Sequence, residues 1–434
     1  MNKSQKTLFL IKSLRIMAFS VLKKYNPKVI SITGSVGKTS AKEAVFIVLA
    51  GKFRVRKNEK NYNNEIGVPL TIIGAESGMQ STRKWLRVFW KWVWLMIFPV
   101  EYPEVLVLEM GADRPGDIDY LTSFVDSKVG VLTEITPSHM EFFKTLEGIA
   151  KEKSILLKKL DEKSIAIINV DNSYIAKMEN QLKSRVITFG FSEEAKMRAT
   201  DVSFIYSEND SIEGISFKLN YAGSSVPVRL KNILARHQVY AALAGAAVGI
   251  EFGLNLVEIS EFLSEFSSPC GRCKLIDGIK NTSIIDDTYN SSPFAALAAM
   301  EIMQNIKASR KIVVMGDMLE LGDETEADHR EIGRKIFSDK IDLFFAFGKR
   351  MKFAVEELEK HNFPKENIFY FEDHESLGRK LQEKIKEGDL ILIKGSQGMR
   401  MEKAVEEIMA DPLKAEYFLC RQNKDWKEKP FELV

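Results

Sequence analysis

Cysteine is scarce in this sequence, with three residues in a chain of 434. Three cysteines cannot build a disulfide framework, which excludes the small disulfide-stapled scaffolds and favours a reducing compartment. Cys270 and Cys273 form a C-x-x-C pair, but Cys420 alone cannot complete a zinc site. The pair follows Ser-Ser-Pro and does not open a helix after a strand. We therefore interpret it as two ordinary thiols on either side of a functional Gly-Arg.

Long apolar runs are also missing. A transmembrane helix needs about 20 predominantly apolar residues, and in LFLIKSLRIMAF the run is broken by Lys12 and Arg15. No small-residue cleavage site follows, so we expect no secretory signal and a cytoplasmic protein. A strong excess of one charge is absent as well. The net charge of +2 gives no argument for a nucleic-acid partner.

The charge is nevertheless uneven along the chain. Residues 1–28 carry seven Lys or Arg and no acid, and the first carboxylate is Glu43. We expect a basic amphipathic helix here, ended by Asn26-Pro27. A second basic stretch, RKWLRVFWKWVWLMIF at 83–98, is rich in aromatic residues. On a helical wheel Arg87 and Lys91 share a narrow polar stripe in an otherwise apolar helix.

Strand-like and helical patterns alternate through the first half of the chain. KVISITG runs into a glycine loop and then into SAKEAVFIVLAG, a helix closed by Gly51. Apolar runs of strand length follow at 103–112, 128–135 and 164–171, with helical patterns between them. This alternation predicts a parallel sheet covered on both faces. Short alternating strands are expected from about Arg198 to Leu230, and an Ala-rich helix over 230–253.

A domain boundary is expected near residues 267–269, after which the alternation starts again. The stretches TSIIDD, KIVVMGD, LFFAFG, IFYFED and DLILIKGS are strand-like, with helices between them. We predict an α/β protein in which a P-loop parallel-sheet ATPase domain is followed by a Rossmann-like α/β domain. The expected bounds are 1–28 for the basic helix, 29–268 for the ATP-binding domain with a Trp-rich insertion at 80–100, and 269–434 for the last domain.

The loop SITGSVGKTS resembles a phosphate-binding loop that is two residues short. The usual pattern places four residues between its glycines, whereas only Ser35 and Val36 separate Gly34 from Gly37. Backbone N–H groups at the start of a helix can face phosphates, Lys38 can reach them, and the Thr39 hydroxyl can hold Mg²⁺. Strand, loop and helix agree with this interpretation.

Further candidate residues follow the predicted strands. Glu109 ends one buried strand and His139 follows the next, at the sheet edge where ligands bind in such folds. We interpret both as residues beside a metal ion. Lys153 lies on a helix fourteen residues after His139 and would be taken for a surface lysine on its own. Asp286 and Asp287 end the first strand of the last domain and could hold a ribose.

Seven ordered blocks resemble the Mur ligase family, and within it the MurF type, which adds D-alanyl-D-alanine to UDP-N-acetylmuramoyl-tripeptide. The blocks are ITGSVGKTSAKE, NYNNEIGVPLTI, VLEMGADRPGDIDYLTS, SHMEFFKTLEGIAKEKSIL, GRCKLIDG with IIDDTYNSSP, VVMGDMLELGDETEADHREIG and LIKGSQGMRMEKAV. They run from about residue 29 to 407 in family order. In this family the short loop is the normal form.

The resemblance implies roles for individual residues. ATP would be bound by Gly34, Ser35, Gly37, Lys38, Thr39, Asn63, Asn64, Gln238, Arg272 and Asp287. Two Mg²⁺ ions would lie beside Thr39, Glu109, His139 and Lys153. Lys153 falls where the family carries a lysine carbamylated by CO₂, a change that converts its positive charge into a carboxylate. Lys38, His139 and Lys153 would be the residues of the reaction itself.

The implied reaction is ATP-dependent amide formation in peptidoglycan synthesis. The γ-phosphate passes to a substrate carboxylate, an amine attacks the acyl phosphate, and ADP and phosphate leave. The substrates would be a muramoyl-peptide-like acceptor and a dipeptide or amino-acid amine, and we expect a monomer. Two alternatives stay open: another amide ligase of the superfamily acting on a folate, cyanophycin or cofactor carboxylate, and a non-catalytic ATP-binding scaffold at the membrane.

Three departures from the family pattern stand out. Only about 30 residues precede the loop, so we expect the usual UDP-sugar-binding platform to be missing. Gln238 stands where the family often has the Asn that meets adenine, so the adenine contact must shift. The segment 74–103 is longer than expected. Its Trp-rich helix would either pack on the N-terminal helix or form, with residues 1–28 and 83–98, a patch on the inner face of the membrane.

Overall fold

The computed structural model describes residues 3–59, 62–79, 81–137, 140–208 and 212–427. The chain divides into two compact units. The first contains Met1–Val202, Phe217–Arg229 and Arg236–Phe266, and the second contains Ser203–Ser216, Leu230–Ala235 and Ser267–Val434. The division into 1–28, 29–268 and 269–434 that the sequence led us to expect stays a prediction.

One sheet begins in the first unit and has the strand order β2-β3-β1-β4-β5-β6-β7-β8-β9 among the described residues. Its strands are β1 (Lys28–Thr33), β2 (Val55–Lys57), β3 (Val105–Glu109), β4 (Val129–Leu132), β5 (Ile165–Asn169), β6 (Arg185–Gly190), β7 (Met197–Tyr206), β8 (Ile212–Tyr221) and β9 (Ser224–Lys231). Neighbouring strands from β2 to β7 pair in parallel.

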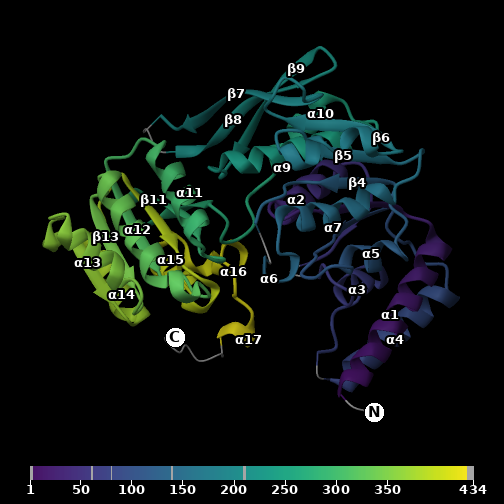
Figure 1. Ribbon diagram of the computed structural model, residues 1–434, viewed down its shortest axis with the longest axis horizontal. Coiled ribbons are helices and arrows are strands. Elements are labelled where there is room, and N and C mark those ends of the chain that lie inside the picture. Colours follow the sequence, from purple (N-terminus) through teal and green to yellow (C-terminus); the bar gives the residue numbers. More distant parts are fainter. Residues whose placement is uncertain (1–2, 60–61, 80, 138–139, 209–211, 428–434) are drawn as a thin grey trace. The chain divides into compact units, whose positions relative to one another are not determined.

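Burial explains why these strands lack a polar face. Every residue of β3 and β4 is buried, as expected for a parallel sheet that is covered by helices on both sides. Because parallel strands share one direction, the carboxyl ends of β1, β3 and β4 meet at the same sheet edge (Figure 1). The parallel α/β sheet that the sequence predicted is confirmed.

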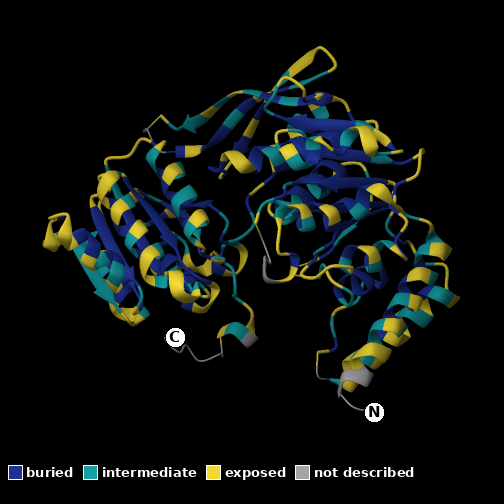
Figure 2. Ribbon diagram, viewed as in Figure 1, coloured by how far each residue is buried: buried dark blue, intermediate teal, exposed yellow. Residues whose placement is uncertain are grey.

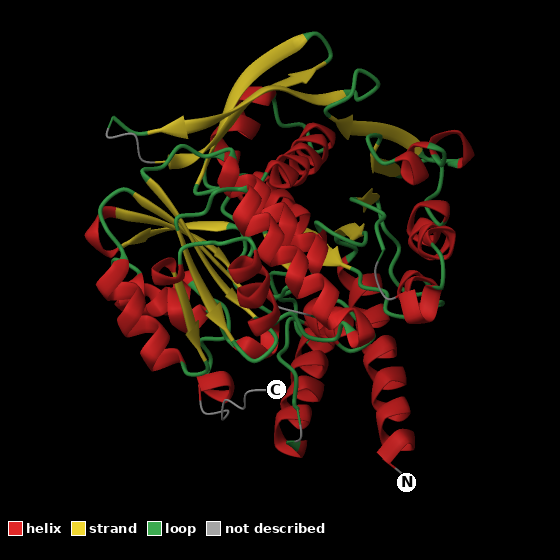
Figure 3. Ribbon diagram, turned by 60° about the vertical axis from the view of Figure 1, so that its left-hand side comes forward, coloured by secondary structure: helices red, strands yellow, loops and turns green. Residues whose placement is uncertain are grey.

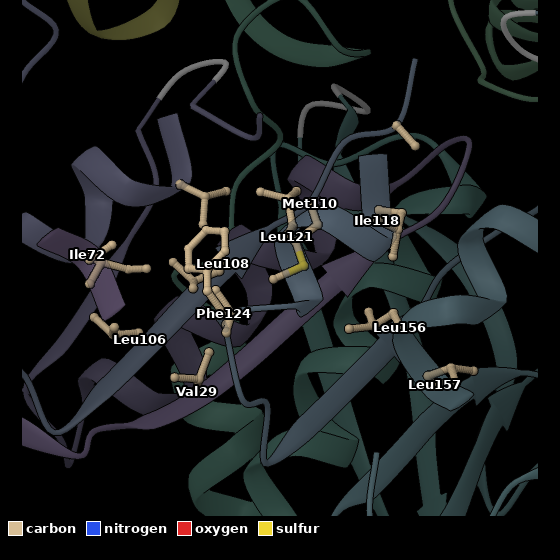
Figure 4. Close-up of a cluster of buried hydrophobic side chains, with 14 of the residues drawn as sticks. Val29, Ile72, Leu106, Leu108, Met110, Ile118, Leu121, Phe124, Leu156 and Leu157 are labelled. Carbon is tan, nitrogen blue, oxygen red and sulfur yellow. The ribbon is translucent and has the colours of Figure 1, made fainter. Parts of the chain in front are cut away.

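The helices of the first unit cover both faces of this sheet. They are α1 (Lys3–Tyr25), α2 (Lys38–Ala50), α3 (Gly67–Ile73), α4 (Thr82–Ile97), α5 (Asp117–Thr122), α6 (Met140–Phe143), α7 (Leu146–Lys158), α8 (Ser173–Ala176), α9 (Arg236–Glu251) and α10 (Leu256–Leu263). Helix α2 packs closely on α9, where a Cβ at Gly245 would lie 3.0 Å from the carbonyl carbon of Ala44. Helices α1, α3, α5 and α7 bury their apolar faces against alternate strand residues on the other side (Figures 2 and 4).

The second unit contains its own sheet, with the order β10-β11-β15-β12-β13-β14. Its strands are β10 (Lys274–Gly278), β11 (Thr282–Asp287), β12 (Arg310–Gly316), β13 (Leu343–Phe347), β14 (Ile368–Phe371) and β15 (Asp389–Lys394). Its helices are α11 (Pro293–Gln304), α12 (Thr325–Ser338), α13 (Lys352–Lys360), α14 (His374–Lys384), α15 (Glu402–Ile408), α16 (Ala415–Phe418) and α17 (Lys424–Lys427).

Two separate cores show how this second sheet is covered. Val313 and Met315 of β12 point into a core shared with α11, α12 and α13. Ile312 and Val314 point into the opposite core, which is shared with α14 and α15. Successive side chains of a strand face opposite sides, so helices are needed on both faces (Figure 3). The expected Rossmann-like α/β arrangement is confirmed.

Two local expectations are corrected. The Ala-rich helix was expected over 230–253, but α9 begins only at Arg236 because Val228 and Leu230 are buried in β9 with exposed residues between them. The alternation of buried and exposed residues in β9 continues into the start of the segment that we had expected to be helical because of its alanines. Strand β10 was not foreseen, and it pairs antiparallel with β11. No helix in the described ranges is long and apolar enough to cross a membrane.

Replacing a core leucine tests the packing of the first unit. We expect Leu106→Ala, at a fully buried position of β3, to lower the free energy of unfolding by about 2–5 kcal/mol because it leaves a cavity. The matched control is Leu86→Ala in α4, whose side chain is 53% exposed and whose loss should cost less than about 0.5 kcal/mol. Urea unfolding followed by circular dichroism measures both, and equal losses would contradict the core assignment.

Candidate active site

The glycine loop connects β1 to α2, and its shape is set by contacts with residues that directly follow β4, the strand beside β1 in the sheet. Gly34 has φ +153°, and a Cβ there would lie 2.0 Å from the Thr133 hydroxyl oxygen, so no side chain fits. Gly37 has φ +84° and caps the N-terminus of α2 in the left-handed region, where glycine alone carries little strain. The Ser35 N–H donates to the Glu134 carbonyl at 2.7 Å. The loop therefore presents the N-terminus of α2 at the sheet edge, a geometry suited to phosphate.

Lys38 extends along this loop. Its Nζ donates to the carbonyl oxygens of Gly34, at 2.7 Å, and Ser35, at 3.0 Å. The ammonium thus lies over the concave side of the loop, where a phosphate would be its natural partner. The Ser35 hydroxyl is buried and makes no hydrogen bond. The roles of Lys38 and Ser35 toward ATP stay predictions.

Glu109 is brought together with Thr39 and Asn63 at the end of β3. One carboxylate oxygen accepts hydrogen bonds from the Thr39 hydroxyl, at 3.3 Å, and from the Asn63 side-chain amide, at 3.2 Å. The other oxygen is buried and accepts no hydrogen bond from any residue that the structure describes. A buried carboxylate oxygen without a hydrogen bond beside a hydroxyl is a donor set that suits Mg²⁺. These residues fit a magnesium ion, although no three His, Cys, Asp or Glu side chains in the described ranges gather into a metal cluster.

Lys42 is a site residue that the sequence analysis missed. Its side chain is 2% exposed, and its Nζ lies 3.4 Å from the unbonded oxygen of Glu109 and 3.7 Å from Glu43. Glu43 in turn pairs with Lys57 of β2. This chain of charges holds the Glu109 carboxylate in place. The signal available in the sequence was a lysine one helical turn after Lys38, in a helix that is apolar at most other positions.

Lys153 of α7 is almost fully buried, with 1% of its surface exposed. Burial and the positive charge of Lys38 lower its pKa from the usual value to about 7. No carboxylate among the described residues lies within ion-pair distance of it, since the neighbouring Glu152 instead accepts from the N–H groups of Gly116 and Ile118. Lys153 is therefore no surface lysine. A buried amine of low pKa is poised to change its charge.

The remaining predicted residues of the first unit have separate positions. The Asn64 side chain accepts from the Gly67 N–H, at the start of α3, at 2.9 Å, and its role toward ATP stays a prediction. Gln238 is buried at the start of α9, and its amide oxygen makes no hydrogen bond. His139 lies outside the described residues, and its metal role stays a prediction.

A pocket of about 830 Å³ opens beside the start of α9 and is lined by Asp171, Phe191, Arg236, His237 and Tyr240, among others. The Arg236 guanidinium lies 4.3 Å from the centre of the Phe191 ring. Tyr240 donates to the Asp171 carboxylate at 2.8 Å. Flat rings, a cation and hydrogen-bonding groups suit a planar heterocycle. The sequence pointed to Gln238 alone and missed this pocket.

In the second unit, Asp287 forms an ion pair with the buried Lys394, at 2.6 Å, and accepts from the Cys273 N–H. Asp286 is enclosed by hydrogen bonds from Gly271 and Thr288, and burial raises its pKa to about 6. The Arg272 guanidinium lies 4.4 Å from the centre of the Tyr289 ring. The role of Arg272 and Asp287 toward ATP stays a prediction, and Lys394 was not foreseen.

The cysteines behave as the sequence analysis expected. Cys270, Cys273 and Cys420 form no disulfide bond within the described part of the chain. Burial raises the pKa of Cys273 and raises that of Cys420 to about 12. Thiols with raised pKa values are poor nucleophiles and poor metal ligands at neutral pH.

A phosphate loop, an acidic strand end and a buried lysine on one sheet edge define an ATP-using α/β enzyme, and comparison with known proteins specifies its family. The Mur ligase middle domain matches residues 94–249, and the Mur ligase glutamate ligase domain matches residues 271–397. The UDP-N-acetylmuramoyl-tripeptide–D-alanyl-D-alanine ligase of Bacillus subtilis is 32% identical over 92% of this chain and 80% of its own. The corresponding ligase of Escherichia coli is 29% identical over 88% of this chain and 76% of its own.

Solved structures agree with this relationship. The MurF ligase of Thermotoga maritima in complex with ADP has a TM-score of 0.72 and 26% identity, and the match covers 92% of this chain and 83% of that one. The chain belongs to the Mur ligase family. It is an ATP-dependent, ADP-forming amide ligase, as the ordered motifs predicted.

Removing Lys42 tests the charge network under the site. We expect Lys42→Met to lower the free energy of unfolding by about 3–5 kcal/mol, because it leaves Glu109 buried without its cation. The control is Lys52→Met, just beyond the end of α2. Lys52 pairs with Glu258 but is 44% exposed, and its loss should cost no more than about 1 kcal/mol. Denaturant unfolding without nucleotide measures both, and a small loss in Lys42→Met would remove its supporting role.

Proposed function

We propose that the protein performs the MurF-type reaction, joining a muramoyl-peptide carboxylate to the amine of D-alanyl-D-alanine. The observation that carries the proposal is the convergence of Lys38, Thr39 and Glu109 at one sheet edge. The substrates come from the names of the relatives that align along most of the chain. Because the reaction uses ATP to make a wall precursor, we place it in the cytoplasm.

The two chemical steps balance without a covalent enzyme intermediate. A carboxylate oxygen of the acceptor attacks the γ-phosphorus, and the bond from this phosphorus to ADP breaks. The amine of the dipeptide then attacks the acyl carbon, inorganic phosphate leaves, and the amine loses a proton. Phosphoryl transfer of this kind needs positioning and charge neutralisation more than a nucleophile.

The residues of the first unit are suited to these needs. Backbone N–H groups of the glycine loop and the Lys38 ammonium would bind the β- and γ-phosphates. Thr39 and Glu109 would hold one Mg²⁺ ion, which supplies positive charge to the phosphate oxygens when bound. Gln238 and the pocket at Asp171 and Tyr240 would receive the adenine. Glutamine is one methylene longer than the asparagine of the family, so its contact with adenine would have to shift.

Lys153 would complete the charge pattern as a carbamate. The neutral amine adds to CO₂ through a new N–C bond and loses a proton, giving an anion. This addition needs an unprotonated amine, which the buried, cation-flanked position of Lys153 favours at neutral pH. A carbamate on Lys153 would then help to hold a second Mg²⁺ ion, with His139 as its expected neighbour.

An ADP-release screen tests the choice of substrate. We expect ADP formation only when UDP-linked muramoyl tripeptide and D-alanyl-D-alanine are both present, and a loss of about 100-fold or more in Lys38→Ala because charge neutralisation is removed. If this amine stimulates no ADP formation with any muramoyl peptide while a folate or cyanophycin acceptor does, the substrate assignment falls. Full cellular function of Lys38→Ala would instead favour the scaffold alternative.

The carbamate makes its own prediction. We expect Lys153→Ala to lower turnover about 100-fold, with partial rescue by acetate or another short carboxylic acid that supplies the missing anion. Lys151→Ala is the matched control, because Lys151 lies on the same helix and is exposed. Equal turnover of the two variants would remove Lys153 from the site. A loss that no carboxylate rescues would remove the carbamate alone.

A further inference from the structure

Helices α1 and α4 form a paired arm in the first unit (Figure 1). The Trp92 indole N–H donates to the Ser20 hydroxyl at 2.8 Å. Lys24 and Tyr25 donate to carbonyl groups at the end of α4, including Leu95 at 2.8 and 2.7 Å. Contacts that run from Ser20 with Trp92 to Tyr25 with Leu95 show that the two helices are parallel. Of the two alternatives for the Trp-rich helix, packing on the N-terminal helix is therefore observed.

Only one side of each helix faces the core. In α1, the buried positions are Leu14, Met17, Ala18 and Val21, and in α4 they are Val88 and Leu95. Trp85, Trp92 and Met96 are partly buried against the same core. The inward faces are therefore occupied, and the outward faces of the arm are left to solvent (Figure 2).

The outward faces are apolar to an unusual degree. Ten of the eighteen large apolar side chains that are exposed in the described part of the chain belong to this arm, so the exposure is concentrated and not scattered. They are Leu8, Phe9, Ile16 and Phe19 of α1, and Leu86, Phe89, Trp90, Trp94, Ile97 and Phe98 in or directly after α4. We call these ten side chains the arm patch.

The arrangement on α4 is a continuous stripe. Leu86, Trp90, Trp94 and Ile97 follow one another at spacings of four, four and three residues, which places them on one side of a helix. Trp90 is 66% and Trp94 54% exposed. Trp94 stacks against Phe98, with ring centroids 4.1 Å apart, and so extends the stripe past the end of the helix.

The charged residues within α1 and α4 themselves are all basic. Residues 1–42 contain no Asp or Glu, and neither do residues 77–100. Lys12 and Lys23 lie exposed on the same side of α1 as Phe9, Ile16 and Phe19. Arg83 and Arg87 are exposed on α4 beside its stripe. An apolar stripe flanked by cations, with tryptophans among its members, has the chemistry of a helix that lies in the interface of an anionic bilayer.

We propose that the arm formed by α1 and α4 docks on the surface of a membrane that contains anionic lipids. The arm patch enters the boundary between headgroups and acyl chains, and the flanking lysines and arginines contact lipid phosphates. Helix α4 has 16 residues and is about 24 Å long, shorter than the roughly 30 Å hydrocarbon core, so it lies along the surface. A second copy of the chain fits poorly, because the same patch would then bring cations against cations.

This inference goes beyond the ligase reaction and does not depend on it. The docking can be measured without any substrate. The chain also provides its own reporter, because four of its five tryptophans, Trp85, Trp90, Trp92 and Trp94, lie in α4. In the variant Trp426→Phe every tryptophan signal comes from that helix.

The test combines fluorescence and co-sedimentation of the purified full chain with phospholipid vesicles. With phosphatidylcholine vesicles that contain phosphatidylglycerol, we expect a blue shift of the Trp426→Phe emission and protein in the pellet. Vesicles of phosphatidylcholine alone should bind several-fold less. Binding to the anionic vesicles should fall several-fold as salt is raised, because salt screens the headgroup attraction.

Matched variants locate the contact. The double variant Trp90→Gln with Trp94→Gln should lose most of the vesicle binding. Its control, Phe294→Gln with Tyr417→Gln, changes aromatic side chains that are 80% and 79% exposed elsewhere and should bind as the parent does. Lys12→Gln with Lys23→Gln should weaken binding to anionic vesicles several-fold, and Lys163→Gln with Lys183→Gln, also exposed lysines, should not. Circular dichroism and thermal unfolding confirm that each variant is folded.

Three results would overturn the proposal. The first is an absence of binding to phosphatidylglycerol vesicles at low salt. The second is binding that the tryptophan variant and its control retain equally. The third is a dimer in sedimentation velocity that the tryptophan variant abolishes while vesicles bind no protein, which would assign the arm patch to a second copy of the chain.

Discussion

A carboxylate held at the end of a buried strand is the constraint on which the site depends. Glu109 ends β3 in a position that is 3% exposed, where an unpaired charge would be costly. Two separate segments supply its partners: Thr39 and Lys42 come from α2, and Asn63 from the loop before α3. The segment with the glycine loop and α2, the loop that carries Asn63, and strand β3 must therefore all be folded before the site exists. Its second carboxylate oxygen accepts no hydrogen bond from the described residues and lies 3.4 Å from the Lys42 ammonium.

Support for the short glycine loop comes from the neighbouring strand. The Thr133 hydroxyl donates to the Val36 carbonyl at 2.6 Å, and Asn169 donates to the Thr133 carbonyl. Gly34 allows this approach because it has no side chain to meet Thr133. A loop with only two residues between its glycines is thus held from β4 and β5. Its N–H groups are oriented before any nucleotide arrives, which limits the reorganisation that binding requires.

Lysine is used in three different ways around this loop. Lys38 bonds to loop carbonyls, Lys42 balances the buried Glu109, and Lys153 is buried without an ion-pair partner among the described residues. Burial and then the positive charge of Lys38 lower the pKa of Lys153 to about 7. A site with this many lysines needs anions to balance their positive charge. Phosphates, and a carbamate on Lys153, would meet that need.

Residue patterns alone predicted the strands on which the site is built. The apolar runs before Glu109 and before Thr133 became β3 and β4, and the glycine loop opened α2 as its motif required. These sequence patterns could not show which residues from distant segments would form ion pairs with each other. Lys42 and Lys394 look like surface lysines in the sequence, because nothing local shows that each is buried against a carboxylate from another segment. The start of α9 was missed for a related reason, since helix propensity cannot show where a preceding strand still pairs.

The Trp-rich helix α4 shows most clearly what the sequence could not determine. Its composition determined that 83–98 would be helical and would need either a protein core or a lipid surface around it. It did not determine which side would face inward, because a helix that is apolar nearly all round has no preferred inner face. Only packing beside α1 and α3 decided this, by burying Val88 and Leu95 and leaving Trp90 and Trp94 in solvent. The sequence alone thus determined the elements, the phosphate loop and the family, whereas the partners of buried charges and the direction of apolar faces arose when distant segments came into contact.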